Sequence, residues 1–183
     1  VNLWLPQMVK RVSDYSDSTV SLLAAIPSLC ALPVMLWAGR HSDRSGERVL
    51  HASIPRVIAG FALLTCFFFV DSTWISIVML SIATIGFYSA HPGFWPLPNL
   101  FLGRAAAAAS IGLINSFGNL GGFVGPYLLG VLSDQSGDFG NGLLYVSACS
   151  FGAGLLVLPI RGVLRKRAAA PPANYRPPFR NTE

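Results

Sequence analysis

The chain has 183 residues, of which 52% are apolar and only 11% are charged, and its formal net charge is +5. An average soluble domain carries charge on roughly a quarter of its residues, so a water-soluble fold of this length would lack the polar surface to cover its core. The basic residues flank apolar runs and form no patch interleaved with aromatic rings, so no nucleic-acid partner is implied. The composition predicts an all-α integral membrane protein.

Five long runs of the sequence contain no Asp, Glu, Lys or Arg. In chain order they are Ser18–Gly39, Val57–Val70, Ser72–Gly103, Ala105–Ser133 and Phe139–Ile160. Four of them reach the roughly 18 to 20 residues that a helix needs to cross a hydrocarbon core. The second becomes long enough when it is extended back to Ala52, with the side chain of Arg56 reaching out to the interface. We therefore expect five complete transmembrane helices.

The segments between these runs predict the boundaries of the helices. Val1–Met8 has the character of the outer end of one more helix whose body is missing, so we interpret the chain as a fragment. Residues 39–51 are polar and are expected to form a loop, and prolines from Pro92 to Pro98 are expected to break or kink the fourth span. Residues 1–161 are predicted to form a transmembrane half-bundle. Residues 162–183, rich in basic residues and proline, are predicted to be a disordered tail.

The basic residues predict how the chain is oriented. If the spans alternate in direction, Lys10 and Arg11 lie on one side of the membrane and the remaining Arg and Lys residues lie on the other. The positive-inside rule places the more basic side in the cytoplasm. We therefore expect a multi-pass protein of the cell (inner) membrane with a cytoplasmic C-terminus.

Four motifs resemble one family of membrane proteins. They are Trp4-Leu5-Pro6-Gln7, the loop from Gly39 to Arg48 with the pattern G-x-x-x-D-R-x-G-x-R, the segment Phe94-Trp95-Pro96-Leu97-Pro98, and the segment from Ile114 to Pro126. The loop resembles the cytoplasmic signature of the major facilitator superfamily in its second repeat. The other three resemble helices seven, ten and eleven of its anion:cation symporter branch, which includes tartrate, phthalate and sugar-acid transporters.

The resemblance implies a fold and a function. The fold is the C-terminal six-helix bundle of a major facilitator protein, with the first helix truncated and the N-terminal half-bundle missing. The function is ion-coupled symport of a small organic anion, such as a dicarboxylate or sugar acid, with a proton or sodium ion by alternating access. Two alternatives stay open: a major facilitator transporter of another substrate class, and a truncated membrane protein that interacts with partners and transports nothing.

The loop signature also has a physical interpretation from its own residues. Gly39 and Gly46 permit tight turns. Asp43 lies beside Arg44 and Arg48 and can engage charges or a helix N-terminus across a domain interface. By resemblance the loop is a latch between the two halves of a transporter. The alternative is a solvated loop that only fixes the topology.

The fourth span carries a polar and aromatic stripe. Its members recur at steps of three and four residues and share one helical face: they are Ser81, Thr84, Tyr88, His91 and Trp95. Such a face is expected to point to a wet cavity or to hydrogen-bond with neighbouring helices. By resemblance Trp95 lines the substrate site, whereas His91 is either a titrating group or a packing residue.

The fifth span carries two amides on a face with glycines. Asn115 and Asn119 lie four residues apart, so both can donate hydrogen bonds to a carboxylate without burying a charge. Small-x-x-x-small steps at Gly118/Gly122 and Gly121/Gly125 allow a neighbouring helix to approach. Asn115 is the residue expected to contact substrate, and Asn119 either joins it or holds the helix crossing together.

The sequence offers no signature of an enzyme. It contains no phosphate-binding loop and no nucleophile with a base at a usable spacing, so we expect neither catalysis nor a cofactor. Cys30, Cys66 and Cys149 lie in different spans, so no metal site is expected. The partners implied are the lipid bilayer, the missing half-bundle, the transported anion and its coupling ion.

Overall fold

The computed structural model describes residue 10, residues 16–136 and residues 140–169. The expected partial helix at Val1–Met8 and the residues from 170 onward lie outside this part. The described elements are all helices, namely α2 Asp17–Ser45, α3 Arg48–Phe68, α4 Thr73–Phe94, α5 Leu97–Phe101, α6 Arg104–Ser136 and α7 Gly140–Ala169. In the described ranges, five segments are long and apolar enough to cross a membrane, with α5 continuing the span of α4. This confirms the predicted fold class.

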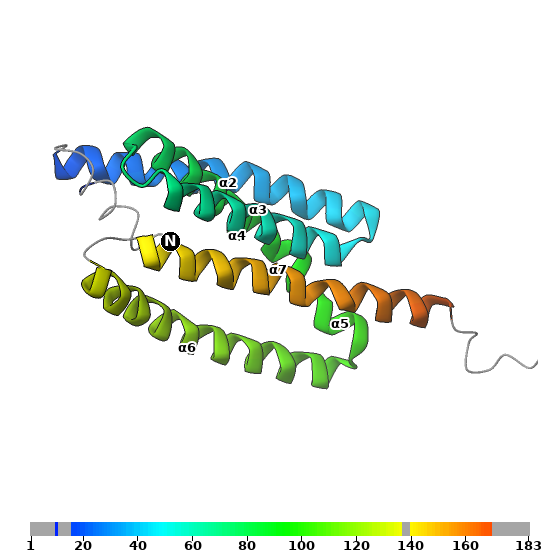
Figure 1. Cartoon of the computed structure of the whole chain (residues 1–183). Coiled ribbons are helices and arrows are strands. Elements are labelled where there is room, and N and C mark those ends of the chain that lie inside the picture. Colours follow the sequence, from blue (N-terminus) through cyan, green and yellow to red (C-terminus); the bar gives the residue numbers. More distant parts are fainter. Residues whose placement is uncertain (1–9, 11–15, 137–139, 170–183) are drawn as a thin grey trace, which may run out of the picture.

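The spans alternate in direction. Figure 1 shows the α2–α3 connection, α5 and the orange end of α7 at one end of the structure. The start of α2, the α3–α4 connection and the yellow start of α7 lie at the other end. The first end therefore holds Arg44 at the end of α2, Arg48 at the start of α3, and the last turn of α7 with Lys166 and Arg167. We call it the basic end.

The core of the bundle lies where α2, α3 and α4 meet. Small residues allow these helices to approach closely: Ala59, Ala83 and Cys66 have no exposed surface. A Cβ on Gly86 of α4 would lie 2.4 Å from the carbonyl oxygen of Pro55 on α3. Close approach through small residues is the usual packing mode in membranes, where dispersion contacts replace the hydrophobic effect.

Serine hydroxyls fasten α7 to α3. Ser53 donates to the carbonyl of Gly154 at 2.7 Å, and Ser147 donates to the carbonyl of Gly60 at 2.9 Å. Ser150 donates to a third backbone carbonyl, that of Arg56, at 2.8 Å. Each hydroxyl finds a carbonyl acceptor on the other helix, so these serines stabilise the contact between α3 and α7.

The loop predicted at residues 39–51 is much shorter than expected. α2 continues through Gly39 to Ser45, and α3 already begins at Arg48. The turn is made at Gly46, whose φ of 68° lies in the left-handed region that glycine tolerates best. Polarity alone therefore misplaced these helix ends, because exposed polar residues extend a helix readily at a membrane surface.

The half-bundle boundary expected at residue 161 also lies within a helix. α7 continues to Ala169. Leu164 packs against a buried cluster at the basic end, and Arg167 donates to the carbonyl of Phe101 at 3.2 Å. These contacts hold the start of the expected tail in helical conformation.

Candidate functional site

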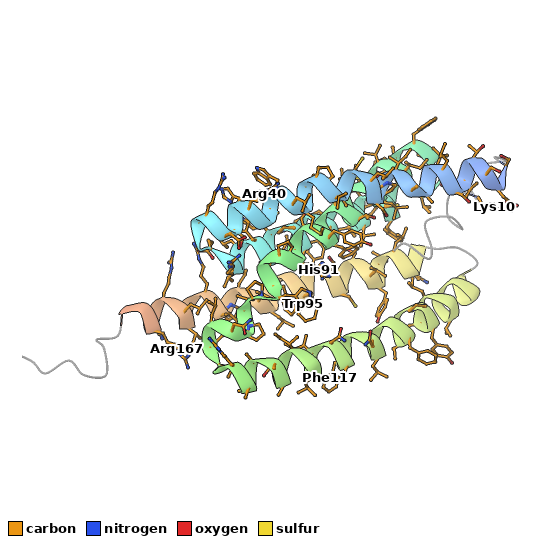
Figure 2. The ribbon with its side chains drawn as sticks, turned by 180° about the vertical axis from the view of Figure 1, so that it is seen from behind. Lys10, Arg40, His91, Trp95, Phe117 and Arg167 are labelled. Carbon is orange, nitrogen blue, oxygen red and sulfur yellow. The ribbon has the colours of Figure 1, made fainter. Side chains whose placement is uncertain are left out.

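Three residues of the predicted site lie together at the end of α4. Tyr88, His91 and Trp95 are all half-buried. The rings of Tyr88 and His91 are 6.2 Å apart between centroids, and the His91 ring hydrogen-bonds through Nδ1 to the carbonyl of Phe87 at 2.7 Å. A carbonyl only accepts, so Nδ1 carries the hydrogen and Nε2 is the nitrogen left to meet a ligand. Figure 2 shows His91 and Trp95 along this part of the chain.

The earlier part of the stripe serves packing. Thr84 is 1% exposed, and its hydroxyl donates to the carbonyl of Leu80 at 2.8 Å. Ser81 is half-buried and donates to the carbonyl of Ile77 at 2.7 Å. Both hydroxyls are satisfied within their own helix, so the polar stripe divides into a packed part and a part that can meet a ligand.

The amides predicted to bind substrate are open on α6. Asn115 and Asn119 are exposed, and neither amide has a hydrogen-bond partner within the described ranges. The glycines beside them are also open: a Cβ added at Gly118 or Gly122 would meet no heavy atom of the described residues within 4 Å. The close helix crossing predicted from these glycines therefore does not occur among the described residues.

The two sets of site residues lie on separate helices. α6 packs mainly on α7 and on α5, whereas α4 packs on α2 and α3. Figure 2 shows Phe117 of α6 on a helix that runs apart from the His91 and Trp95 region. The structure thus groups Tyr88, His91 and Trp95 but does not place Asn115 or Asn119 in contact with them.

The loop signature is held by ion pairs within the chain. Asp43 pairs with Arg48, whose guanidinium also donates to the hydroxyl of Ser42 at 3.3 Å. Arg44 is exposed. Gly46 makes the predicted turn, but Gly39 does not: it lies inside α2, where an added Cβ would lie 3.3 Å from the Cβ of Pro92. Gly39 therefore serves the contact between α2 and α4.

Sequence reasoning missed a second ion pair at the basic end. Glu47 accepts from the backbone N–H of Leu50 at 3.3 Å and caps α3. Its other carboxylate oxygen lies 3.1 Å from Arg161 of α7. An acidic residue just before a helix is a signal for capping, but nothing in the sequence pairs it with an arginine so far along the chain.

Arg56 contacts α4, and its predicted reach to the membrane interface stays a prediction. Its guanidinium lies 5.3 Å from the centroid of the Phe87 ring on α4, and the residue is half-buried. A cation over an aromatic face is stabilised by the ring quadrupole. Arg56 is a charge held inside the helical bundle, where ionisable residues usually serve function.

The matches to known proteins agree with this architecture. Residues 1–126 match the family model described as Major Facilitator Superfamily. The chain therefore belongs to the major facilitator superfamily and is part of a multi-pass membrane protein. No solved structure gives a significant match.

Among curated relatives, a protein of Agrobacterium vitis named "Putative tartrate transporter" is 38% identical over 160 residues, covering 86% of this chain and 35% of the relative. The "Quinolone resistance transporter" of Acinetobacter baumannii is 36% identical and covers 80% of this chain and 34% of that protein. The "Probable galactarate/D-glucarate transporter GudP" of Bacillus subtilis is 29% identical, covering 92% and 39%. The chain thus spans about a third of the length of the first two of these relatives.

Proposed function

We propose that the chain is part of a secondary transporter that moves a small organic anion, a dicarboxylate or a sugar acid, by symport with a proton or sodium ion. The relatives named for tartrate and for galactarate/D-glucarate support this substrate class. The observation that carries the proposal is the pair of open amides, Asn115 and Asn119, on a membrane-length helix. Amide groups bind carboxylates without adding a buried charge, and lipid gives no reason for them to be there.

In this proposal the substrate passes between the α4 residues and the α6 amides. Trp95, Tyr88 and the Nε2 atom of His91 form one wall, and Asn115 and Asn119 form the other. Two half-bundles rock around such a site during alternating access, so the second half comes from outside these 183 residues. Asp43, Arg44 and Arg48, with the turn at Gly46, belong to the latch at the cytoplasmic side.

The orientation is part of the proposal. With the basic end in the cytoplasm, α7 delivers the C-terminus to the cytoplasmic face of the cell membrane. A cysteine-reactive, membrane-impermeant label applied to intact cells tests this placement at a cysteine introduced at Arg165. Labelling without permeabilisation would contradict the orientation.

Uptake measurements test the substrate class. The natural reading frame is expressed in cells lacking their own uptake, and accumulation of labelled tartrate and D-glucarate is followed with proton or sodium gradients collapsed separately. We expect Asn115→Ala to lower uptake at limiting substrate roughly tenfold to a hundredfold, because a hydrogen bond to a charged group contributes about 1.5–3 kcal/mol. Trp95→Ala should lower it by a similar factor.

Ser116→Ala is the matched control for the α6 variants. Ser116 is exposed on α6 beside Asn115, but its hydroxyl already donates to the carbonyl of Gly112 at 2.9 Å. We expect near-normal uptake for this variant. Normal uptake by Asn115→Ala and Trp95→Ala, with normal protein levels in the membrane, would remove these residues from the site.

A second substrate class is suggested by the relative named for quinolone resistance, which is 36% identical to this chain. Drug export would make cells that express the natural reading frame less susceptible to quinolones and would leave organic-acid uptake unchanged. A stable assembly with neither activity would favour the third possibility, a membrane protein that interacts with partners and transports nothing.

A further inference from the structure

A groove of about 580 Å³ lies between α2, α3 and α4, and the proposed transport path does not use it. Trp37 of α2, Ile54 and Ile58 of α3, and Ile82 and Ile85 of α4 contribute apolar walls. On α4 these positions lie on a different helical face from Tyr88, His91 and Trp95. The groove is therefore a separate feature from the candidate substrate site.

The surface of the groove is almost entirely apolar, and most of the polar residues that line it lie toward the basic end. His41, Ser45, Glu47 and His51 line it there. Nδ1 of His41 lies 2.7 Å from Nε2 of His51, and His51 hydrogen-bonds through Nδ1 to the carbonyl of Glu47. Because that carbonyl only accepts, Nδ1 of His51 carries a hydrogen, and one further hydrogen lies between the two facing nitrogens. Nε2 of His41, the outer nitrogen of the pair, belongs to an exposed side chain and donates to an anion in the form of the pair that carries one positive charge.

The acidic residues at this end are already neutralised. Asp43 pairs with Arg48, and Glu47 pairs with Arg161. Arg40 and Arg44 are exposed and have no ion-pair partner in the described part of the chain. Figure 2 shows Arg40 at this end of α2. Arg40 and Arg44 precede the groove residues His41 and Ser45 on α2, so uncompensated positive charge lies beside this end of the groove.

Ser89 places an unsatisfied hydroxyl on the groove. The residue is 4% exposed and lines the groove, and its Oγ has no hydrogen-bond partner among the residues that the structure describes. Ser81 and Thr84 of the same helix do donate to their own backbone. A buried hydroxyl without a partner is costly, so a ligand that accepts its hydrogen bond would be favoured.

We propose that this groove binds an acyl chain of an anionic membrane phospholipid. The phosphate lies against His41 near Arg40 and Arg44, an ester carbonyl accepts from Ser89, and the chain lies along Ile54, Ile58 and Ile82. Taken together, the lining residues change from ionisable and polar at the basic end to apolar further inward. This change matches the order of groups in a phospholipid, and basic sites between transmembrane helices bind anionic headgroups. A transmembrane helix of a partner protein would match only the apolar part.

Lipid competition tests this assignment. The natural reading frame is purified in mild detergent, equal amounts of phosphatidylglycerol and phosphatidylcholine are added, and native mass spectrometry gives the ratio of bound lipids. We expect phosphatidylglycerol to be enriched roughly fivefold to tenfold, and His41→Gln to remove most of the enrichment. Ile58→Trp should reduce the binding of both lipids, because the exposed position lets the larger ring fill the groove.

Matched variants on α7 control for general effects. Leu156→Trp and Arg165→Gln make the same kinds of change at exposed positions outside the groove, and both should retain the wild-type ratio. Ser89→Ala should weaken lipid binding without lowering the melting temperature. Equal enrichment of phosphatidylglycerol in His41→Gln and Arg165→Gln would mean that general surface charge causes the effect, and it would overturn the proposal. Lipid binding retained in folded Ile58→Trp and Ile54→Trp would overturn it as well.

Discussion

The interface between α3 and α7 and the open face of α6 are built from similar residues but behave differently. Both contain glycines and side chains that hydrogen-bond. At the first, an added Cβ on Gly154 would lie 2.8 Å from Cγ2 of Val57, and three serines donate across the interface. On α6, a Cβ added at Gly118 or Gly122 would meet nothing within 4 Å in the described part of the chain, and Asn115 is exposed. Figure 1 shows α6 set apart from the α2–α3–α4 group.

This difference shows that small and polar residues predict a helix face that makes contacts, but they do not predict which partner that face contacts. A serine hydroxyl is short and reaches a carbonyl of another helix only where two backbones approach closely, as at Ser53 and Gly154. An asparagine amide reaches further and offers both donors and an acceptor. Asn115 and Asn119 therefore suit a ligand or a moving surface, whereas the serines suit a fixed interface.

The largest effect is expected at the tightest contact of the packed region. Gly86→Ala would force its Cβ to within 2.4 Å of the carbonyl oxygen of Pro55, so α3 and α4 must separate. We expect a loss of about 1–3 kcal/mol in stability, seen as a lower melting temperature in detergent. An unchanged melting temperature would mean that α3 and α4 lie further apart than the structure shows.

A smaller effect is expected at the serine contacts. Ser53→Ala and Ser147→Ala each remove one hydrogen bond between α3 and α7. Because such bonds contribute about 0.6 kcal/mol on average in membrane proteins, each variant should lower the melting temperature slightly and the double variant about twice as much. Ser116→Ala, whose hydroxyl bonds only to its own helix, serves as the control and should change nothing. A larger loss in Ser116→Ala than in Ser53→Ala would contradict the assigned roles.

The smallest effect on stability is expected on α6. Gly118→Ala adds a methyl group to open space, so its stability should stay within about 0.5 kcal/mol of the wild type. The comparison is made in the natural reading frame with the same melting assay. A loss as large as that of Gly86→Ala would show that a segment outside these 183 residues covers the glycine face.

Much of the fold was accessible from the sequence. Uninterrupted apolar runs predicted the five spans, because a helix is the simplest way to satisfy the backbone in lipid. The turn at Gly46 was predicted correctly from glycine, whereas Gly39 was wrongly predicted to turn. The two glycines differ because Gly39 packs against Pro92 of α4. The residues around Gly39 in the sequence do not predict this neighbour.

Less of the candidate site could be predicted. The periodicity of α4 placed Thr84 and Tyr88 on one face, but only the structure shows that Thr84 is buried and Tyr88 is half-buried. The predicted substrate roles of Trp95, Asn115 and Asn119 stay predictions. The histidine pair at the groove mouth joins residues that the sequence analysis did not connect, because α2 and α3 bring them together only after the turn.

The sequence by itself determined that the chain is helical, that its helices cross a membrane, and that its positive charges collect at one end. These properties depend on the free energy of transferring each residue into lipid and on the length of each segment. Both can be obtained by adding up neighbouring residues in the sequence. The tertiary structure decided which polar groups are satisfied and which stay open. Glu47 pairs with Arg161, Ser53 bonds to Gly154, and the hydroxyl of Ser89 finds no hydrogen-bond partner within the described ranges, because each outcome depends on how distant helices approach one another.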